Sequence, residues 1–89
     1  MPRNIWQDYG QVIASKYRRG VVLALRNRPM TPTEISREMG VGTACISRSL
    51  RELAEKQIVI CLTPKRKKGR VYSLTKKGVE IAKILGERS

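Results

Sequence analysis

The chain has 89 residues, of which 19 are Lys or Arg and 7 are Asp or Glu, so its formal net charge is +12 at pH 7. A chain of this length has room for one hydrophobic core, and we expect residues 1–89 to form a single domain. The excess of positive charge favours a polyanionic partner, nucleic acid before an anionic membrane surface. No apolar run has the length of a signal peptide or a membrane span, which predicts a cytoplasmic protein.

The first 14 residues predict a helical extension that precedes the core. Its apolar side chains recur at mostly helical spacing and include Ile5, Trp6, Tyr9 and Val12. A break near Gly10 or Ser15 then separates it from a helix over residues 15–27. Pro29 prevents that helix from continuing. Its predicted inward stripe consists of Tyr17, Val21, Ala24 and Leu25.

Residues 31–57 predict a helix, a tight turn and a second helix. Thr31, Pro32 and Glu34 have the pattern of a capping box, and Gly40 is suited to end the first helix. Ile46, Leu50, Leu53 and Gln57 fall on one face of the second helix, and the first three are predicted to anchor it to the core. The opposite face carries Ala44, Ser47, Arg48, Arg51 and Glu55. Small side chains allow close approach and arginines reach base edges, so we interpret this as a DNA-recognition helix.

Residues 58–74 predict a β-hairpin, which we call the wing. Its strands are expected at 58–62 and 70–74, joined by the basic loop 63–69. Within the wing, five of the six residues from 65 to 70 are cationic: Lys65, Arg66, Lys67, Lys68 and Arg70. Such a run is often a solvated or disordered loop, and it could also be a nuclear-localisation patch. Because strands pin these like charges beside the recognition helix, we favour contact with phosphates.

Residues 75–86 predict a last helix, capped by Thr75 and ended by Gly86. Its apolar side chains wrap around more than one face and comprise Val79, Ile81, Ala82, Ile84 and Leu85. The order of elements predicts a mostly α fold with a small β-hairpin (α+β). This is a winged helix-turn-helix, with a three-helix core, a wing and terminal helices.

In these motifs the sequence resembles small archaeal winged-helix transcriptional regulators related to ArsR and MarR proteins. The resemblance spans about residues 9–82 and rests on KYRRGVVLAL, TPTEIS, CISRSLREL, CLTPKRKKGRVYSLT and the KKG that follows. It implies a homodimeric DNA-binding repressor or activator, with the recognition helix in the major groove and the wing over the backbone or minor groove. By resemblance, Ser47, Arg48, Arg51 and the run 65–70 face DNA. The sequence departs from the family pattern at Gly42, where a capping Ser is common, and it lacks the paired-cysteine metal motif of ArsR-type sensors.

The candidate DNA contacts lie in three places. On the recognition helix they are Thr43, Ala44, Ser47, Arg48 and Arg51, on the wing they are the five cations, and at the start of the preceding helix they are Thr31 and Thr33. We expect Arg48 to contact bases and Arg51 to contact phosphates. Pairing with Glu52 and Glu55 would be worth only about 0.2–0.5 kcal/mol each and would not hold the arginines from DNA. Lys16, Arg18 and Arg19 could contact phosphates or simply solubilise the surface.

The apolar surplus at both ends of the chain predicts a homodimer. The expected dimerisation residues have no evident place in a three-helix core and are Ile5, Trp6, Tyr9, Val12, Ile81, Ile84 and Leu85. Two chains related by a two-fold axis could bury both ends together. The preferred DNA site would then be an inverted repeat.

Other chemistry has little support in the sequence. Without His and with two distant cysteines, we expect no metal, no cofactor, no small-molecule ligand and no enzymatic activity. Cys45 at the start of the recognition helix could be a redox sensor, but a small residue that fits against DNA is favoured. Cys61 is expected to be a buried apolar residue. Two other functions stay open, namely a non-specific architectural DNA-binding protein and an RNA- or protein-binding winged helix.

Overall fold

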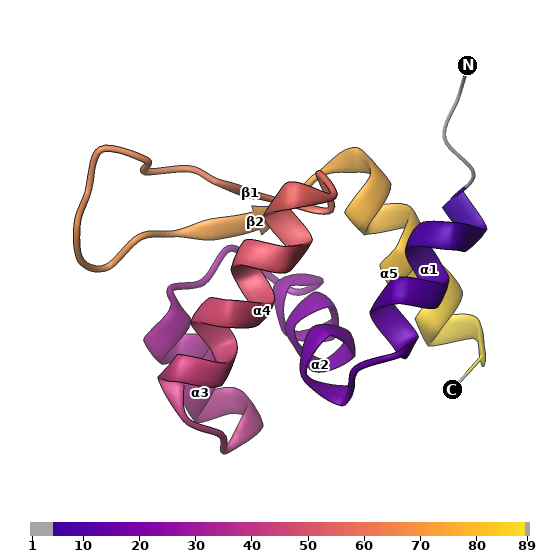
Figure 1. The fold of residues 1–89 in the computed structure, drawn as a ribbon, viewed down its shortest axis with the longest axis horizontal. Helices are drawn as coiled ribbons and strands as arrows, with labels where there is room; N and C mark the ends of the chain where they lie inside the picture. Colours follow the sequence, from indigo (N-terminus) through magenta and orange to yellow (C-terminus); the bar gives the residue numbers. More distant parts are fainter. Residues whose placement is uncertain (1–4, 89) are drawn as a thin grey trace.

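The computed structural model describes residues 5–88 (Figure 1). Residues 1–4 of the predicted N-terminal extension lie outside this part. The elements in chain order are α1 (Ile5–Ile13), α2 (Lys16–Leu25), α3 (Pro32–Met39), α4 (Thr43–Glu55), β1 (Val59–Cys61), β2 (Tyr72–Leu74) and α5 (Lys76–Arg88). The predicted class and order of elements are confirmed. The break after the first helix falls at Ala14 and Ser15, and Gly10 lies inside α1.

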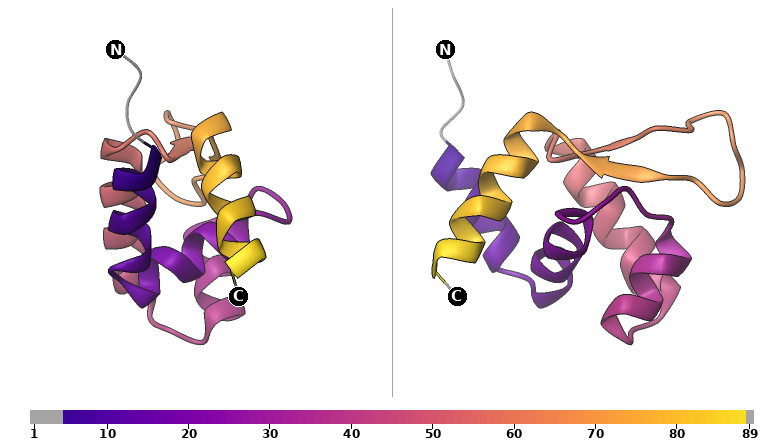
Figure 2. Two further views of the ribbon diagram at one scale, coloured as in Figure 1. Left: turned by 90° about the vertical axis from the view of Figure 1, so that its right-hand side faces the viewer. Right: turned by 180° about the vertical axis from the view of Figure 1, so that it is seen from behind.

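Three helices, α2, α3 and α4, pack together, and the wing projects from one side of them (Figure 1). On the other side α1 and α5 contact α2 and each other (Figure 2). One apolar core joins both parts and contains Val12, Val21, Val22, Ala24, Leu25, Met30, Ile35, Ile46, Leu50, Leu53, Ile58, Val59, Ile81, Ala82 and Leu85. The terminal helices therefore complete the core that holds the helix-turn-helix.

The predicted capping box at the start of α3 is present. The Thr31 hydroxyl oxygen accepts the N–H of Glu34 at 3.2 Å, and the Glu34 carboxylate accepts the N–H of Thr31 at 2.9 Å. Gly40 ends α3 in the left-handed conformation, with φ of 68°. Gly42, where the family pattern has a capping Ser, is the N-cap of α4 and supplies no side-chain hydrogen bond. The first N–H groups of the recognition helix are thus left without a side-chain cap.

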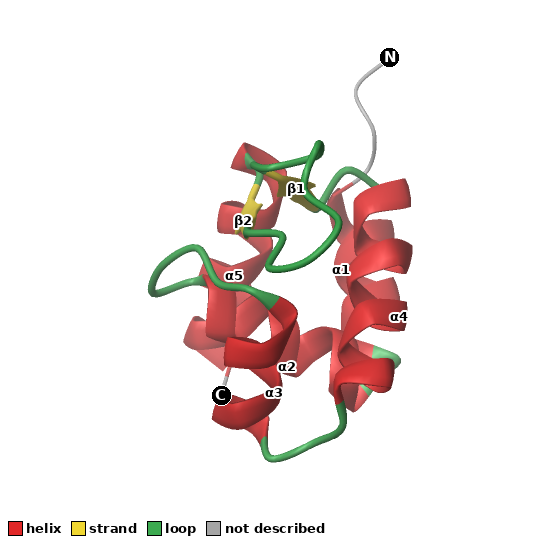
Figure 3. Ribbon diagram, turned by 90° about the vertical axis from the view of Figure 1, so that its left-hand side faces the viewer, coloured by secondary structure: helices red, strands yellow, loops and turns green. Residues whose placement is uncertain are grey.

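Backbone hydrogen bonds attach the base of the wing to the core. The strands pair antiparallel, with Val59 opposite Leu74 and Cys61 opposite Tyr72. On the other edge of β2, Tyr72 and Met30 exchange hydrogen bonds of 2.8 and 3.0 Å. Both strands are shorter than predicted. Each has three residues, and the chain between them forms the long loop of the wing, which is green in Figure 3.

The prediction that the terminal helices carry surplus apolar residues is wrong in part. Val12 and Ile81 are 0% exposed and Leu85 is 5% exposed, because α1 and α5 cover each other and α2. Packing of these two helices also places Lys77 Nζ 3.1 Å from the buried Asp8 Oδ2. The three core residues are therefore not available on the surface of a single folded chain.

Two helix ends also differ from prediction. α5 continues through Gly86 to Arg88, and Gly86 does not adopt the left-handed conformation that would end a helix. Its missing side chain instead allows close approach, since a Cβ at Gly86 would lie 2.9 Å from Arg26 Nη1. α4 ends at Glu55, before the predicted end at Gln57, and Gln57 has φ of 61°.

Candidate nucleic-acid interface

The outward face of α4 has the composition expected of a recognition helix. Burial of Ile46, Leu50 and Leu53 fixes the rotation of the helix about its own axis. That rotation exposes all five candidate contacts, which are Thr43, Ala44, Ser47, Arg48 and Arg51. Within the described part of the chain, no ion pair or hydrogen bond engages the guanidinium of Arg48 or Arg51. Both side chains are therefore free to contact a ligand.

A groove of about 650 Å³ lies between α4, the start of α3 and the wing, and we call it the wing groove. It brings together candidate contacts from three separate stretches, namely Thr33, Ser47, Arg51, Lys67, Lys68 and Arg70. Its remaining lining is Pro32, Leu50, Ala54, Cys61, Gly69 and Tyr72. One side of this groove is thus α4, and another is formed by the wing cations Lys67, Lys68 and Arg70.

Hydrogen bonds between residues 62–63 and residue 71 join the two sides of the wing where its basic loop begins and ends. The Leu62 N–H donates to the Val71 carbonyl at 2.7 Å, and the Val71 N–H donates to Thr63 Oγ1 at 3.0 Å. Nearer the tip, the Arg70 Nε–H donates to the Arg66 carbonyl. The five cations are exposed and remain close together on this loop. Such a cluster gives a strongly positive potential beside α4.

The candidate contacts do not all border the wing groove. Arg48 borders a smaller hollow of about 280 Å³ between α4 and the start of α2, which we call the α2 hollow. Lys65 and Arg66 lie near the tip of the wing, beside Leu62 and Pro64. Thr31 is half-buried and its hydroxyl oxygen caps α3.

Cys61 and Glu52 have surroundings that the sequence did not predict. Cys61 is half-buried rather than buried, and with Tyr72 opposite it lines the wing groove. Alternation along β1 places Cys61 on the face of the buried Val59, so this pattern predicts burial and does not indicate the partial exposure. Glu52 does not pair with Arg48 but lies 3.4 Å from Arg18 of α2. This contact joins residues far apart in the chain, and no local pattern indicates it.

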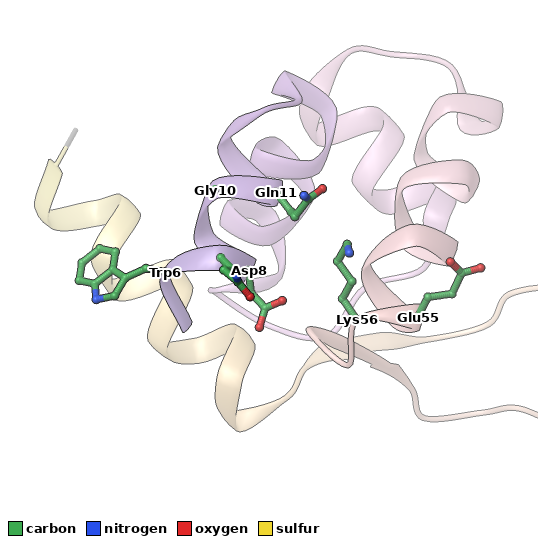
Figure 4. A pocket seen from close by; sticks show the side chains of 7 residues that line it. Trp6, Asp8, Gly10, Gln11, Glu55 and Lys56 are labelled. Carbon is green, nitrogen blue, oxygen red and sulfur yellow. The ribbon is translucent and has the colours of Figure 1, made fainter. Parts of the chain in front are cut away.

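A second open cleft, of about 640 Å³, lies between α1 and the end of α4. Figure 4 shows Trp6 and Asp8 on α1, and Glu55 and Lys56 at the end of α4. Trp6 is 52% exposed and meets Tyr9 edge to face, with 5.7 Å between ring centroids. A large aromatic side chain is therefore presented to solvent on the side of the molecule opposite the wing.

Neither a metal site nor a membrane span is indicated by residues 5–88. No three potential ligands among His, Cys, Asp and Glu gather there. None of the helices in that range is long and apolar enough to cross a bilayer. Cys45 and Cys61 are both free.

Comparisons with known proteins agree with this architecture. A family model described as bacterial regulatory protein, arsR family, matches residues 15–60. TubR bound to 24 bp of tubC, from Bacillus thuringiensis serovar israelensis pBtoxis, aligns over 100% of this chain and 99% of its own, with TM-score 0.83 and 13% identity. The transcriptional repressor BigR from Xylella fastidiosa aligns over 92% and 83%, with TM-score 0.77 and 22% identity. ZitR from Lactococcus lactis aligns over 82% of this chain and 51% of its own, with TM-score 0.73 and 19% identity. The present chain thus spans about half the length of ZitR, and no curated protein matches it in sequence.

The fold defines a protein of the winged helix-turn-helix class. The matched segment contains α2, α3 and α4, which form the helix-turn-helix and its support. The chain belongs to the ArsR family of regulatory proteins, since the family model covers residues 15–60 of 89. The ArsR part of the resemblance is confirmed, and an archaeal origin stays a prediction.

Proposed function

We propose that the protein is a sequence-specific regulator that binds double-stranded DNA with α4 in the major groove. The observation that carries the proposal is the exposed, unpaired Arg48 and Arg51 beside a wing with five exposed cations. Its site of action would be the cytoplasm. The wing would lie over the phosphate backbone or the minor groove.

The proposed contacts follow from the dimensions and chemistry of α4. A helix with side chains is about 10–12 Å wide and the major groove about 12 Å wide, so α4 can enter it. Ala44 and Ser47 are small and permit close approach of the helix to the bases. Arg48 would donate to base edges. Arg51 shares the wing groove with Lys67 and Lys68, and we assign these three to phosphates.

We also propose that two chains bind as a homodimer through α1 and α5. Of the residues first predicted for this contact, Trp6 is exposed and Ile5, Tyr9 and Ile84 are half-buried. The structure adds two exposed apolar side chains on the same helices, Ile13 at 44% and Val79 at 42%. Because the wing projects from the opposite side, a dimer formed through α1 and α5 would leave α4 and the wing of each chain free (Figure 1). An inverted repeat with half-sites about 34 Å apart would fit such a dimer.

Arg48→Ala tests the sequence-specific function. The probes are a duplex selected from a random-sequence pool by the intact protein and one unselected duplex of equal length. We expect a loss of about 1–3 kcal/mol on the selected duplex and a much smaller loss on the other. Lys83→Ala is the control, because it removes one exposed positive charge from α5.

An architectural function is the second candidate, and the net charge of +12 is the observation that favours it. It predicts that Arg48→Ala weakens binding equally on both duplexes. It also predicts that the random pool yields no preferred sequence. Either result would replace the sequence-specific proposal with charge-driven coating of DNA.

A further inference from the structure

The side chain of Arg18 connects three helices. Arg18 belongs to the first turns of α2, and its side chain is 17% exposed. Its Nε–H donates to the carbonyl oxygen of Gln11 on α1 at 2.8 Å. Its Nη1 lies 3.4 Å from Oε1 of Glu52 on α4. A single guanidinium thus fixes the carboxylate of the recognition helix relative to the end of α1.

Glu52 is one helical turn after Arg48, the i,i+4 spacing at which opposite charges pair on a helix surface. Both residues border the α2 hollow together with Arg18. Glu52 nevertheless pairs with Arg18 instead of Arg48. The inter-helix contact therefore holds the nearest carboxylate away from the arginine that would contact DNA.

We propose that Arg18 is a positioning residue for DNA recognition: by holding Glu52, it leaves the Arg48 guanidinium available to the bases. The inference rests on the proposed function. Without Arg18, the Glu52 carboxylate would be free to pair with Arg48 along the same helix. Such a pair would not keep Arg48 from DNA, but breaking it on binding would lower the affinity by a small factor, that of one i,i+4 pair.

A set of variants tests this, measured by affinity for the selected duplex in buffer of low ionic strength, where ion pairs are least screened. We expect Arg18→Gln to weaken binding roughly 1.4- to 2.3-fold more than the control Arg19→Gln, which is the size of an i,i+4 pair. Arg19 is exposed on the same helix, so its replacement removes the same charge. The additional loss should disappear when Glu52→Gln is combined with Arg18→Gln. It should also disappear in an Arg48→Ala background.

The outcomes separate this inference from the proposed function. If Arg48→Ala leaves affinity for the selected duplex unchanged, both the recognition role of Arg48 and the role of Arg18 are overturned. If Arg48→Ala weakens binding but Arg18→Gln behaves as Arg19→Gln does, only the role of Arg18 is overturned. A loss with Arg18→Gln that persists in the Arg48→Ala background would show that Arg18 contacts DNA itself or only supports the fold.

Arg18→Lys guards against a variant that fails to fold. It keeps the charge but cannot make the two directed contacts of the guanidinium together. We expect its affinity to lie between those of the intact protein and Arg18→Gln, with a thermal unfolding midpoint near that of the intact protein. Affinity that simply follows the unfolding midpoint across all the variants would contradict a positioning role.

Discussion

Arg48 and Arg51 lie less than one helical turn apart on α4, but they border different surfaces. Arg51 lines the wing groove with Lys67 and Lys68, whereas Arg48 borders the α2 hollow with Glu52. The difference arises because successive helical residues are rotated by about 100°, so a shift of three changes the neighbouring element. At the residue scale, position around α4 therefore supports different roles for two arginines that the sequence presents as similar.

The capping box predicts a pH dependence of stability. Hydrogen bonds from the Thr31 N–H and then from Arg28 lower the pKa of Glu34 below its ordinary value of 4.5. A lowered pKa in the folded state means that the carboxylate stabilises the fold at pH above the unfolded value. This stabilisation is lost as the pH falls through the folded pKa. We expect Glu34→Gln to flatten the pH dependence of urea unfolding below about pH 5, and an unchanged slope would contradict this role.

Two glycines predict opposite effects of an added methyl group. A Cβ at Gly78 would lie 2.2 Å from the carbonyl oxygen of Ile58, so α5 could not keep its position against the backbone that precedes β1. We expect Gly78→Ala to lower the free energy of unfolding by about 1–3 kcal/mol. A Cβ at Gly10 in α1 would have no neighbouring atom beyond its own helix backbone within 4 Å. We therefore expect Gly10→Ala to raise the free energy of unfolding by about 0.5–1 kcal/mol. Urea denaturation measures both, and equal effects of the two substitutions would rule out the contact at Ile58 as the cause.

At the scale of elements, α4 and the wing line the same groove and form one continuous surface. The base of the wing is attached to the core by the hydrogen bonds between Tyr72 and Met30. Further along, hydrogen bonds between residues 62–63 and residue 71 join its two sides. The cations of the wing thus lie beside α4 on a loop whose base is hydrogen-bonded to the core. Phosphates beside an inserted α4 would neutralise this concentrated charge.

Replacing Lys65, Arg66, Lys67 and Lys68 by Ala should therefore weaken binding to all duplexes by similar factors. For each phosphate that the wing no longer neutralises, the plot of log affinity against log salt should become less steep by about 0.9. The measurement is a salt series on the selected and the unselected duplex. An unchanged slope would show that the wing does not lie on DNA.

At the scale of the whole molecule, α1 and α5 bury some of their apolar side chains in the core and expose others to solvent. Val12, Ile81 and Leu85 complete the core, while Trp6, Ile13 and other apolar side chains remain on the surface. Deleting residues 1–14 would remove Val12 as well as Trp6. Such a deletion would therefore damage the fold and could not test dimerisation alone.

The combined substitution Trp6→Glu and Ile13→Glu tests the dimer on exposed positions. We expect the intact protein to sediment as a dimer at micromolar concentration and the double variant as a folded monomer, because charges disfavour burial of this surface. Leu62→Glu, which alters an exposed apolar residue of the wing, is the matched control and should remain dimeric. Intact protein that sediments at monomer mass would overturn the dimer and the inverted-repeat site.

The sequence by itself determined the elements whose signals are local. The capping box at Thr31, the left-handed Gly40 and the apolar spacing of Ile46, Leu50 and Leu53 each depend on residues a few positions apart. Together they predicted the helix-turn-helix and its exposed face, and the residues 58–74 separately predicted the basic hairpin. The cations of the wing were evident from the run of residues 65–70 in the sequence.

Only the tertiary structure decided which surfaces these elements share. The pairing of Arg18 with Glu52, the contact of Asp8 with Lys77 and the burial of Val12 depend on residues that are distant in the chain. Apolar spacing shows that a helix has a buried face but not which neighbour covers it. The terminal helices could therefore be assigned to a partner chain from sequence, whereas in the structure they first cover each other and α2. Packing between distant segments is decided by the summed shape and volume of the whole core, and a pattern within one segment does not contain that information.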